Sequence, residues 1–407
     1  MLITTDNLSH LQSELLFGSL TGLSLAKNML TGLIPLSIGN LSDLTRLYLF
    51  QNHLSGSIPE EIGKLRSLTK LILFENILMA SIPRSIGNLE IGNLLSIETL
   101  ALDENNLTSN VPNSIGDLEK LTTLSLFGNK LSGQIPSAIG NLTNLYYLEL
   151  SRNNLYGAIP PELGTLKLLA YIHIFQNQLS GHLPANICIG GSLTMFIVSI
   201  NNFVGAMPRS LKNCSSLTTI GVGENQLSGN ISEEFGVYAN AEFISLRKNK
   251  FFGELSSNWS AYSKWSAYLN LVALEISNNN LSGRIPTGLG ELSCLQKLSL
   301  SSNHLHGKIP RSLGKPTLLL YLKLHNNNLS GNIPSEIGQM SRLLNLSLSA
   351  NNLSGSIPEQ IGNCTQLLDL NLSQNALIDS IPSQIGYLPS LATLDLSQNM
   401  LLWCSIL

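Results

Sequence analysis

Charged side chains are scarce in this chain of 407 residues. They make up 12% of the sequence, whereas a typical soluble domain holds roughly 25%. The net charge is −3 and the isoelectric point is about 6.2. A nucleic-acid-binding protein needs a basic face, so the composition predicts that nucleic acid is not a partner. The polar surface must consist mainly of Asn, Ser, Thr and Gly.

Long apolar runs are missing as well. A membrane-spanning helix needs about 20 consecutive apolar residues, and no stretch of the sequence comes near that length. The first residues, MLITTDNLSHLQSELLFGS, contain no basic segment followed by an apolar one, which is the pattern of a secretory signal peptide. The sequence therefore predicts neither a membrane span nor a signal peptide in this chain.

Motifs of catalysis and metal binding are also lacking. There is no HRD…N or DFG sequence and no glycine-rich loop followed by a catalytic lysine, so we expect no kinase domain. His304 and His306 have no further ligands in view that would complete a metal site. The segment GVGENQ, residues 221–226, is not followed by a helix, as a phosphate-binding loop would be. We expect no enzymatic activity, no metal and no cofactor.

What the chain does contain is an asparagine that returns every 24 residues, with two longer gaps, in a fixed frame of leucines. The frame reads LxxLxLxxNxLxGxIPxxIGxL, as in LSDLTRLYLFQNHLSGSIPEEIGKL at residues 41–65. A fixed period of this size indicates stacked supersecondary units, none of which can bury its apolar face alone. The frame asparagines are Asn28, Asn52, Asn76, Asn105, Asn129, Asn153, Asn177, Asn201, Asn225, Asn249, Asn279, Asn303, Asn327, Asn351, Asn375 and Asn399.

Each part of the frame predicts a piece of one coil. Alternation at the strand places Leu47 and Leu49 inside and Tyr48 and Phe50 outside. The frame asparagine ends the strand, and its amide can satisfy backbone groups that a narrow coil would otherwise bury unpaired. The proline of GxIP fixes φ and lacks a donor, which predicts an extended segment and a 3₁₀ or short helix on the outer limb. The sequence thus predicts a leucine-rich repeat solenoid of α/β type, with a curved parallel sheet of sixteen strands on its concave face.

The repeats are expected to fill residues 20–407, sixteen in number with the last one incomplete, and residues 1–19 to form an irregular or partial repeat without a cysteine cap. The gap is 29 residues before Asn105 and 30 before Asn279. The extra residues are near copies of their neighbours, IGNLE with IGNLL and WSAYSK with WSAYLN. Both insertions fall on the outer limb, where a bulge leaves the sheet intact. Tryptophan and tyrosine in the second could anchor a partner, or the duplication is merely tolerated.

The LxGxIP segment within a 24-residue repeat is typical of plant leucine-rich repeats. Along nearly its whole length, the chain resembles the extracellular domain of plant leucine-rich repeat receptor-like kinases. The stretch LSGNIPSEIGQMSRLLNLSLSANNLSGSIPEQIGNC, residues 329–364, looks most like the group that senses small secreted peptides. The resemblance implies an extracellular or plasma-membrane location, a secreted peptide or other protein as ligand, and a co-receptor kinase as a further partner. Family members also carry a signal peptide, cysteine-paired caps, a membrane span and a kinase, so the chain resembles a truncated ectodomain without a signalling domain.

Five cysteines are too few for a disulfide scaffold. Cys188 and Cys214 lie eleven and thirteen residues after their frame asparagines, on the outer limbs of adjacent coils, where such residues come within bridging range. The family resemblance implies a disulfide between them, and the alternative is two small buried side chains. Cys294, Cys364 and Cys404 are expected to be unpaired.

N-x-S/T sequences are frequent, and many of them arise from the consensus NNLSG. They suit an extracellular surface. Asn345 and Asn371 would point from the concave sheet itself, where a glycan would block that part of the face. The other glycosylation candidates are Asn40, Asn106, Asn141, Asn213, Asn230, Asn258, Asn280, Asn328, Asn352 and Asn363.

The residues that flank the inward leucines line the concave face. The first half of this face is aromatic, and the second half is polar and rich in serine. Exposed aromatic side chains are the usual anchors of a recognition surface. We therefore predict ligand contacts at Tyr48, Phe50, Phe74, Phe127, Tyr147, Glu149, Arg152, Tyr171, His173 and Phe175.

Within this set, the four phenylalanines share one slot of the repeat, and they can equally serve as cross-strand supports that stack along the sheet. Tyr147, Glu149, Tyr171 and His173 depart from the repeat pattern and cluster on adjacent coils, so they are the stronger ligand-binding candidates. Because histidine titrates near pH 6.5, His173 would make binding sensitive to pH.

Three functions remain open at this point. A peptide-binding ectodomain without its own signalling domain fits the resemblance best. The alternative is a soluble inhibitor or decoy of pathogen cell-wall enzymes, although proteins of that kind are shorter and carry cysteine caps. The third is a non-functional receptor fragment whose uncapped ends expose core leucines.

Overall fold

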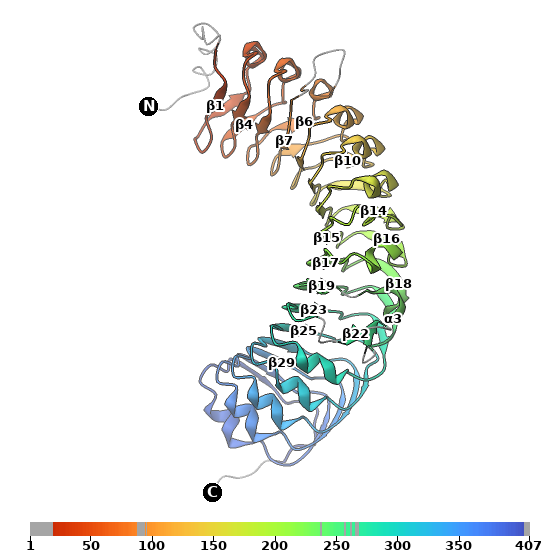
Figure 1. Ribbon diagram of the computed structural model, residues 1–407. Coiled ribbons are helices and arrows are strands. Elements are labelled where there is room, and N and C mark those ends of the chain that lie inside the picture. The colour runs from red at the N-terminus through yellow and green to blue at the C-terminus, as the bar shows by residue number, and fades with distance from the viewer. Residues whose placement is uncertain are drawn as a thin grey trace. The chain divides into compact units, whose positions relative to one another are not determined.

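The computed structural model describes residues 19–87, 94, 96–236, 238–255, 258–260, 263–264 and 268–402. The predictions for residues 1–18, for Cys404 and for most of both insertions lie outside the described residues. The chain divides into two compact units, Met1–Phe203 and Val204–Leu407. Within each unit the same coil repeats, with a strand on one side and a short helix or turn on the other (Figure 1).

Each coil contributes one three-residue strand to a parallel sheet, in which neighbouring strands follow one another along the chain. Leu47 pairs with Leu71 of the next coil, so equivalent residues lie opposite each other. This confirms the predicted solenoid with one sheet strand per repeat. The sheet strands of the first unit are β1 (Gly22–Ser24), β3 (Arg46–Tyr48), β5 (Lys70–Ile72), β7 (Thr99–Ala101), β9 (Thr123–Ser125), β11 (Tyr147–Glu149), β13 (Tyr171–His173) and β15 (Met195–Ile197). Those of the second unit are β17 (Thr219–Gly221), β19 (Phe243–Ser245), β23 (Ala273–Glu275), β25 (Lys297–Ser299), β27 (Tyr321–Lys323), β29 (Asn345–Ser347), β31 (Asp369–Asn371) and β33 (Thr393–Asp395).

A second row of short strands follows the frame asparagines. These strands are β2 (Thr31–Leu33), β4 (His53–Ser55), β6 (Met79–Ala80), β8 (Asn106–Leu107), β10 (Ser132–Gly133), β12 (Asn154–Gly157), β14 (Gln178–Gly181), β16 (Asn202–Gly205), β18 (Gln226–Asn230), β20 (Lys250–Glu254), β24 (Asn280–Ser282), β26 (His306–Gly307), β28 (Asn328–Gly331), β30 (Asn352–Gly355) and β32 (Ala376–Leu377). Within the second insertion, β21 (Asn258–Ser260) pairs antiparallel with β22 (Ser263–Lys264).

Short helices follow the prolines on the outer limb, as the sequence predicts. In most coils the proline is extended, as Pro334 is at φ −66° and ψ 134°, and a 3₁₀ turn begins at the next residue. The 3₁₀ helices are η1 (Leu36–Asn40), η2 (Glu60–Lys64), η3 (Arg84–Ile86), η4 (Asn113–Asp117), η5 (Ser137–Asn141), η6 (Pro161–Thr165), η8 (Thr287–Glu291), η9 (Arg311–Gly314), η10 (Ser335–Gln339), η11 (Glu359–Asn363) and η12 (Ser383–Tyr387). Two limbs form α-helical turns instead, α2 (Arg209–Lys212) and α3 (Ile231–Glu234). None of the helices in the described part of the chain combines the length and apolar character that a bilayer span requires.

The leucines of the frame form the interior, as predicted. Leu47 and Leu49 are 0% and 5% exposed, whereas Tyr48 and Phe50 between and after them are half-buried on the open side of the sheet. We call this open side the strand face. It consists of the residues that alternate with the inward leucines on the sheet strands, together with the residue that follows each inner leucine pair.

The frame asparagines form the predicted ladder, and Asn327 shows its chemistry. Its Oδ1 accepts a hydrogen bond from the Leu305 N–H of the preceding coil at 3.0 Å. Its Nδ2 donates to the Leu300 carbonyl of the preceding coil at 3.0 Å and to the Leu324 carbonyl of its own coil at 3.1 Å. Asn327 is 7% exposed. Without it the Leu305 N–H would be buried and unpaired, whereas the two carbonyls also accept from Asn303 and Asn351 of the ladder.

The residue before every frame asparagine has a left-handed backbone, which the sequence does not reveal. The φ values of the non-glycine residues at this position run from 46° at Glu104 to 57° at Ile200. Such a conformation costs roughly 1–2 kcal/mol per residue in isolation. Its N–H bonds to the next coil, as Gln51 N does to the Phe74 carbonyl at 2.9 Å. The interlocked coils thus impose the turn on residues with no preference for it.

The glycine of the IG pair has a packing role. A Cβ built on Gly338 of η10 would lie 2.2 Å from the carbonyl oxygen of Gln360 in the next coil, a separation that real Cβ atoms do not reach. Only a glycine lets the two 3₁₀ turns approach this closely. At the same position of η12, a Cβ built on Gly386 would have no atom of the described residues within 4 Å.

We expect Asn327→Leu to lower the free energy of unfolding by about 1–3 kcal/mol, because leucine keeps the volume but leaves the buried Leu305 N–H unpaired. The neighbouring Asn328 is exposed, so Asn328→Leu is a matched control that should change stability by less than about 0.5 kcal/mol. Urea unfolding followed by circular dichroism measures both variants. Equal midpoints for the two would contradict a structural role for the ladder.

We expect Gly338→Ala to destabilise the protein by about 1–3 kcal/mol, because the added methyl group forces two coils apart. Gly386→Ala, at the same position of the repeat, should stay within about 0.5 kcal/mol of the parent protein. Thermal and urea unfolding of the two variants test the difference. A Gly338→Ala protein as stable as the Gly386→Ala protein would show that close approach does not explain the IG glycine.

Candidate ligand-binding site

All ten predicted contact residues belong to the first unit, and the structure divides them into two groups. Tyr48, Phe50 and Phe74 lie on or just after β3 and β5. The other seven lie on or just after β9, β11 and β13, and we call them the β9–β13 cluster: Phe127, Tyr147, Glu149, Arg152, Tyr171, His173 and Phe175. The eight aromatic and histidine rings are half-buried, Arg152 is exposed and Glu149 is buried.

The first group consists of rings that pack on each other. Phe50 and Phe74 stack with their centroids 4.5 Å apart and their planes at 15°. Tyr48 lies 6.4 Å from Phe50 in a tilted arrangement. This parallel stack between neighbouring strands fits the interpretation of these phenylalanines as cross-strand supports.

The rings of the β9–β13 cluster meet mostly edge-on. Tyr147 and His173 have centroids 5.5 Å apart at 81°, and Tyr171 and His173 lie 6.3 Å apart at 87°. Tyr146, a residue that the sequence analysis missed, packs edge-on against Tyr171 at 5.3 Å and is 50% exposed. The doublet of tyrosines before the inner leucine of this coil was the available signal. Together the four rings form an aromatic surface across two neighbouring strands.

Beside these rings, Phe127 and Phe175 lie 6.3 Å apart at 48°. The Arg152 guanidinium lies over the Phe127 ring, 5.5 Å from its centroid, which is within range of a cation–π interaction. Arg152 also approaches the Glu104 carboxylate at 4.0 Å. Arg152 therefore has partners on the protein and contributes the exposed cationic edge of the cluster.

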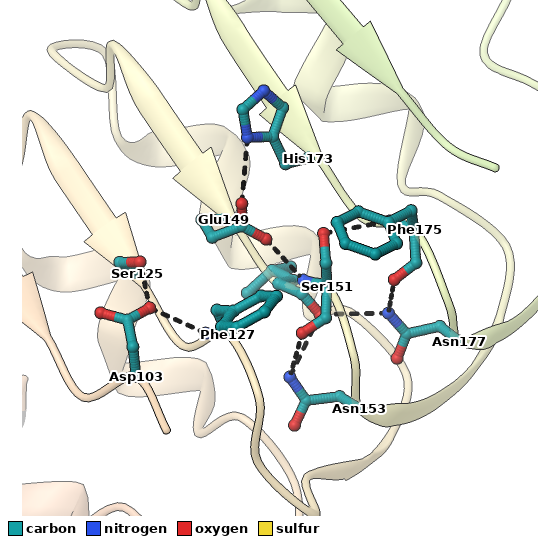
Figure 2. A network of polar contacts seen from close by, with 10 residues as sticks. Asp103, Ser125, Phe127, Glu149, Ser151, Asn153, His173, Phe175 and Asn177 are labelled. Atoms are coloured by element: carbon teal, nitrogen blue, oxygen red, sulfur yellow. Dashed lines mark hydrogen bonds and ion pairs between the residues drawn. The ribbon is translucent and has the colours of Figure 1, made fainter. Parts of the chain in front are cut away.

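Glu149, predicted from the sequence as an exposed ligand contact, is a buried residue. Its side chain is 7% exposed, and both carboxylate oxygens are engaged. Oε1 accepts a hydrogen bond from Ser151 N at 2.8 Å, and Oε2 lies 3.0 Å from Nδ1 of His173 (Figure 2). The hydroxyl of the fully buried Ser151 accepts from Phe175 N at 3.1 Å. The carboxylate thus joins the turn after its own strand, at Ser151, to His173 on the next strand.

A second carboxylate, Asp103, lies next to this network, and the sequence analysis missed it too. Its Oδ1 accepts from Phe127 N at 3.0 Å and from the Ser125 hydroxyl. Burial raises the pKa of Asp103 above its ordinary 3.8, the two hydrogen bonds oppose that shift, and the charge of Glu149 adds to it. Asp103 stands in the slot that holds phenylalanine in neighbouring coils, and that substitution was the available signal.

Tyr147 reports the same negative surroundings. Burial raises its pKa to about 12, and the charges of Glu149 and Asp103 and a hydrogen bond to Glu149 contribute further. The phenol therefore stays protonated at every physiological pH. An uncharged Tyr147 hydroxyl thus lies close to the carboxylates of Glu149 and Asp103.

The strand face of the second unit is polar. Glu275 of β23 accepts from the Ser245 hydroxyl at 3.1 Å and forms an ion pair with Lys297. Burial and the charge of Lys323 lower the pKa of His325. Among the described residues, no group of three or more His, Cys, Asp or Glu side chains is placed to hold a metal ion.

The predicted covalent sites also have defined places. Cys188 and Cys214 are both disulfide-bonded, while Cys294 and Cys364 are free; the pairing of the first two with each other stays a prediction. Asn345 lies on the strand face, as expected, and so does Asn371. The side chain of Asn258 is not described. The exposed glycosylation candidates are Asn40, Asn141, Asn213, Asn280, Asn328, Asn352 and Asn363, and the half-buried ones are Asn106 and Asn230.

We expect Asp103→Asn to raise stability at neutral pH. A folded-state pKa above the unfolded value means that ionised Asp103 costs stability as soon as the pH exceeds about 3.8, and the full cost is present above the folded-state pKa. An amide oxygen can still accept both hydrogen bonds without carrying charge. Urea unfolding between pH 7 and pH 3 should show the gain disappear on acidification.

Asp395 provides the control with the opposite sign. Hydrogen bonds from the Ser397 hydroxyl and N–H lower the pKa of Asp395. Its ionised form therefore stabilises the folded state above the unfolded-state pKa, and this stabilisation is lost as the pH falls through the folded-state pKa. Asp395→Asn should therefore lower stability at pH 7 and match the parent protein in acid. If both asparagine variants shifted in the same direction, the assigned surroundings of Asp103 would be wrong.

Comparison with known proteins agrees with the architecture. The leucine-rich repeat family model matches residues 19–41, 43–65, 120–142, 144–166, 270–292, 294–316, 318–340 and 342–364. A search among curated proteins gives no match. The chain is similar to the ectodomain of the membrane receptor kinase GASSHO1/SCHENGEN3 from Arabidopsis thaliana, solved with CASPARIAN STRIP INTEGRITY FACTOR 2. That comparison gives 35% identity and a TM-score of 0.86 over 94% of this chain and 44% of the other.

Two further plant receptors are comparably similar. PEPR1, solved with AtPEP1, gives 34% identity and a TM-score of 0.88 over 94% of this chain and 52% of that one. The chain therefore spans about half the length of these first two ectodomains. The Arabidopsis receptor kinase HAESA, solved with an extended IDA peptide hormone, gives 32% identity and a TM-score of 0.81 over 95% of this chain and 71% of that one. HAESA has also been solved with IDA and the co-receptor SERK1, at 29% identity, a TM-score of 0.70 and coverage of 98% and 76%. The chain belongs to the family of leucine-rich repeat ectodomains of plant receptor kinases.

Proposed function

We propose that this chain is a ligand-recognition domain that binds a secreted peptide on its strand face, at the β9–β13 cluster. The observation that carries the proposal is the group of edge-on rings on β11 and β13, formed by Tyr146, Tyr147, Tyr171 and His173. Aromatic side chains that keep an open face and a polar tip are the usual anchors of recognition surfaces.

The sheet itself leaves recognition to side chains. The strands of the first unit bond to neighbours in chain order, so within the unit their backbone groups are already paired. A ligand cannot add to the sheet between them and must be read by the strand-face residues. Neighbouring strands lie about 4.8 Å apart, and an extended peptide rises about 3.3 Å per residue. The step from β9 to β13 therefore corresponds to roughly three residues of a peptide that lies across the strands.

The relatives support a peptide as the ligand. GASSHO1/SCHENGEN3 was solved with CASPARIAN STRIP INTEGRITY FACTOR 2, and HAESA with the peptide hormone IDA. By analogy, we place this chain on the extracellular side of a plasma membrane, with no catalytic role of its own. The HAESA complex with SERK1 makes a co-receptor kinase the natural second partner.

We expect Tyr171→Ala to weaken peptide binding by about 30-fold, the effect of removing a central aromatic anchor. The probes are synthetic secreted plant peptides, including IDA, AtPEP1 and CASPARIAN STRIP INTEGRITY FACTOR 2, titrated calorimetrically against the whole chain. Tyr321 occupies the same position of the repeat on β27 and is 36% exposed. Tyr321→Ala is therefore the matched control and should bind as the parent protein does.

Two results would count against the proposal. If none of the peptides binds the parent chain, the peptide-binding function itself is wrong. If a peptide binds and Tyr171→Ala leaves its affinity unchanged, the ligand lies elsewhere on the protein. Circular dichroism of each variant separates a lost contact from a lost fold.

A further inference from the structure

One ring nitrogen of the half-buried His173 is a buried polar atom without a partner in the described part of the chain. This nitrogen is Nε2. The side chain keeps 15% exposure, and its neighbours Tyr147 and Tyr171 are half-buried rings. Figure 2 shows this nitrogen on the side of the ring that faces away from Glu149. Unpaired buried polar atoms are rare because they cost free energy, so this one calls for a partner from outside the chain.

Glu149 decides what kind of partner fits. Ser151 N donates to Oε1 at 2.8 Å and thereby fixes the orientation of the carboxylate. The other oxygen lies 3.0 Å from Nδ1 of His173. A carboxylate oxygen accepts hydrogen bonds, so Nδ1 of His173 carries a proton and donates to Glu149. In the neutral imidazole with its proton on Nδ1, Nε2 carries the lone pair and accepts a hydrogen bond.

The charges around the ring exclude an anionic partner. Glu149 contacts the His173 ring directly. Asp103 lies close enough to Glu149 for the charge of Glu149 to raise the pKa of Asp103. The hydroxyl of Tyr147 stays protonated. Arg152, the cation of the cluster, lies over Phe127 and near Glu104. A carboxylate or sulfate placed at Nε2 would face the lone pair of that nitrogen, with the Glu149 carboxylate on the other side of the ring.

We propose that His173 Nε2 accepts a hydrogen bond from an uncharged N–H or O–H donor of the bound peptide. In this arrangement Glu149 is a positioning residue, which contacts no ligand and fixes the tautomer of His173. The inference rests on the proposed peptide-binding function and adds the chemistry of one ligand group. Rotation of a neighbouring tyrosine side chain, a common change on binding, opens the atom to that donor.

The substitution Glu149→Gln tests this chemistry while keeping the shape. Ser151 N still requires an acceptor, so the amide oxygen of glutamine takes the place of Oε1. The amide NH₂ then faces Nδ1 of His173, which must become the acceptor. The proton moves to Nε2, and the atom that accepted a hydrogen bond becomes a donor. The variant is therefore predicted to reverse the preference of the site.

The first measurement needs no ligand. Nitrogen-15 NMR of histidine-labelled protein should show His173 with a protonated Nδ1 in the parent chain and a protonated Nε2 in Glu149→Gln. Glu275 is a buried glutamate at the same strand position on β23, so Glu275→Gln is the matched control and should leave the His173 signal unchanged. The same tautomer in the parent chain and in Glu149→Gln would overturn the assignment.

The second measurement uses whichever synthetic peptide binds the parent chain. Each backbone N–H is replaced in turn by N-methyl, and each hydroxyl by its methyl ether. At one position, removal of the donor should weaken binding to the parent chain by about tenfold and hardly affect Glu149→Gln. Glu275→Gln should reproduce the parent profile.

The outcomes separate the two proposals. A peptide that binds with identical donor profiles in the parent chain and in Glu149→Gln overturns the role of His173 and leaves peptide binding intact. The role of His173 would also be overturned if removal of each peptide donor weakened binding to His173→Ala and to the parent chain by the same factor. If no peptide binds, peptide recognition fails first, and the NMR result alone then decides whether Glu149 sets the tautomer.

Discussion

The side-chain amide of the frame asparagine is the interaction on which the rest of this structure depends, because it bonds across the border between coils. Asn105 shows how strict the requirement is. It follows an insertion, yet its Oδ1 still accepts from Leu78 N at 3.0 Å and its Nδ2 still donates to the Leu73 carbonyl at 3.1 Å. Asn279 follows the other insertion and keeps the equivalent bond to the Leu246 carbonyl at 3.0 Å. The insertions therefore leave the ladder bonds intact, and the strands on both sides of each insertion stay in the same register.

Because the strand backbone repeats from coil to coil, the coils differ mainly in their strand-face side chains. Some polar side chains on this face already bond to their own coil and are not available to a ligand. Asp395 accepts from the N–H and the hydroxyl of Ser397, and Asn371 does the same with Ser373. Glu149 satisfies the N–H two residues further on in the same manner. Carboxylates and amides at this position of the repeat thus cap the turn at the end of their own strand. A charged residue on the face is accordingly weaker evidence for a ligand contact than an aromatic ring, whose edge-on neighbours leave part of its surface open.

The repeat could be predicted from sequence because its determinants are residue types at fixed spacing: leucines for the interior, asparagine for the ladder, proline for the outer limb. The left-handed turn before each asparagine could not, since residues as different as Lys27 and Ile200 occupy it and the neighbouring coils impose it. The candidate site likewise has features that residue type and spacing predict and features that depend on contacts between coils. The ring positions of Tyr147 and Tyr171 followed from the strand alternation. The role of Glu149 depends on one hydrogen bond to a residue 24 positions away and another to a turn N–H, and neither leaves a trace in the sequence.

The two aromatic groups of the first unit differ in what they leave for a ligand. Phe50 and Phe74 are parallel at 4.5 Å, so each ring covers a face of the other and the pair gains little from a third partner. Tyr171 and His173 meet at 87° and Tyr147 and His173 at 81°, arrangements in which an edge of one ring packs on the face of the next. The second group also contains an unpaired polar atom and a carboxylate that fixes its protonation, neither of which cross-strand support requires. Stacking alone therefore accounts for the phenylalanines that follow β3 and β5, whereas the group on β11 and β13 also contains the unpaired nitrogen that we propose a bound peptide engages.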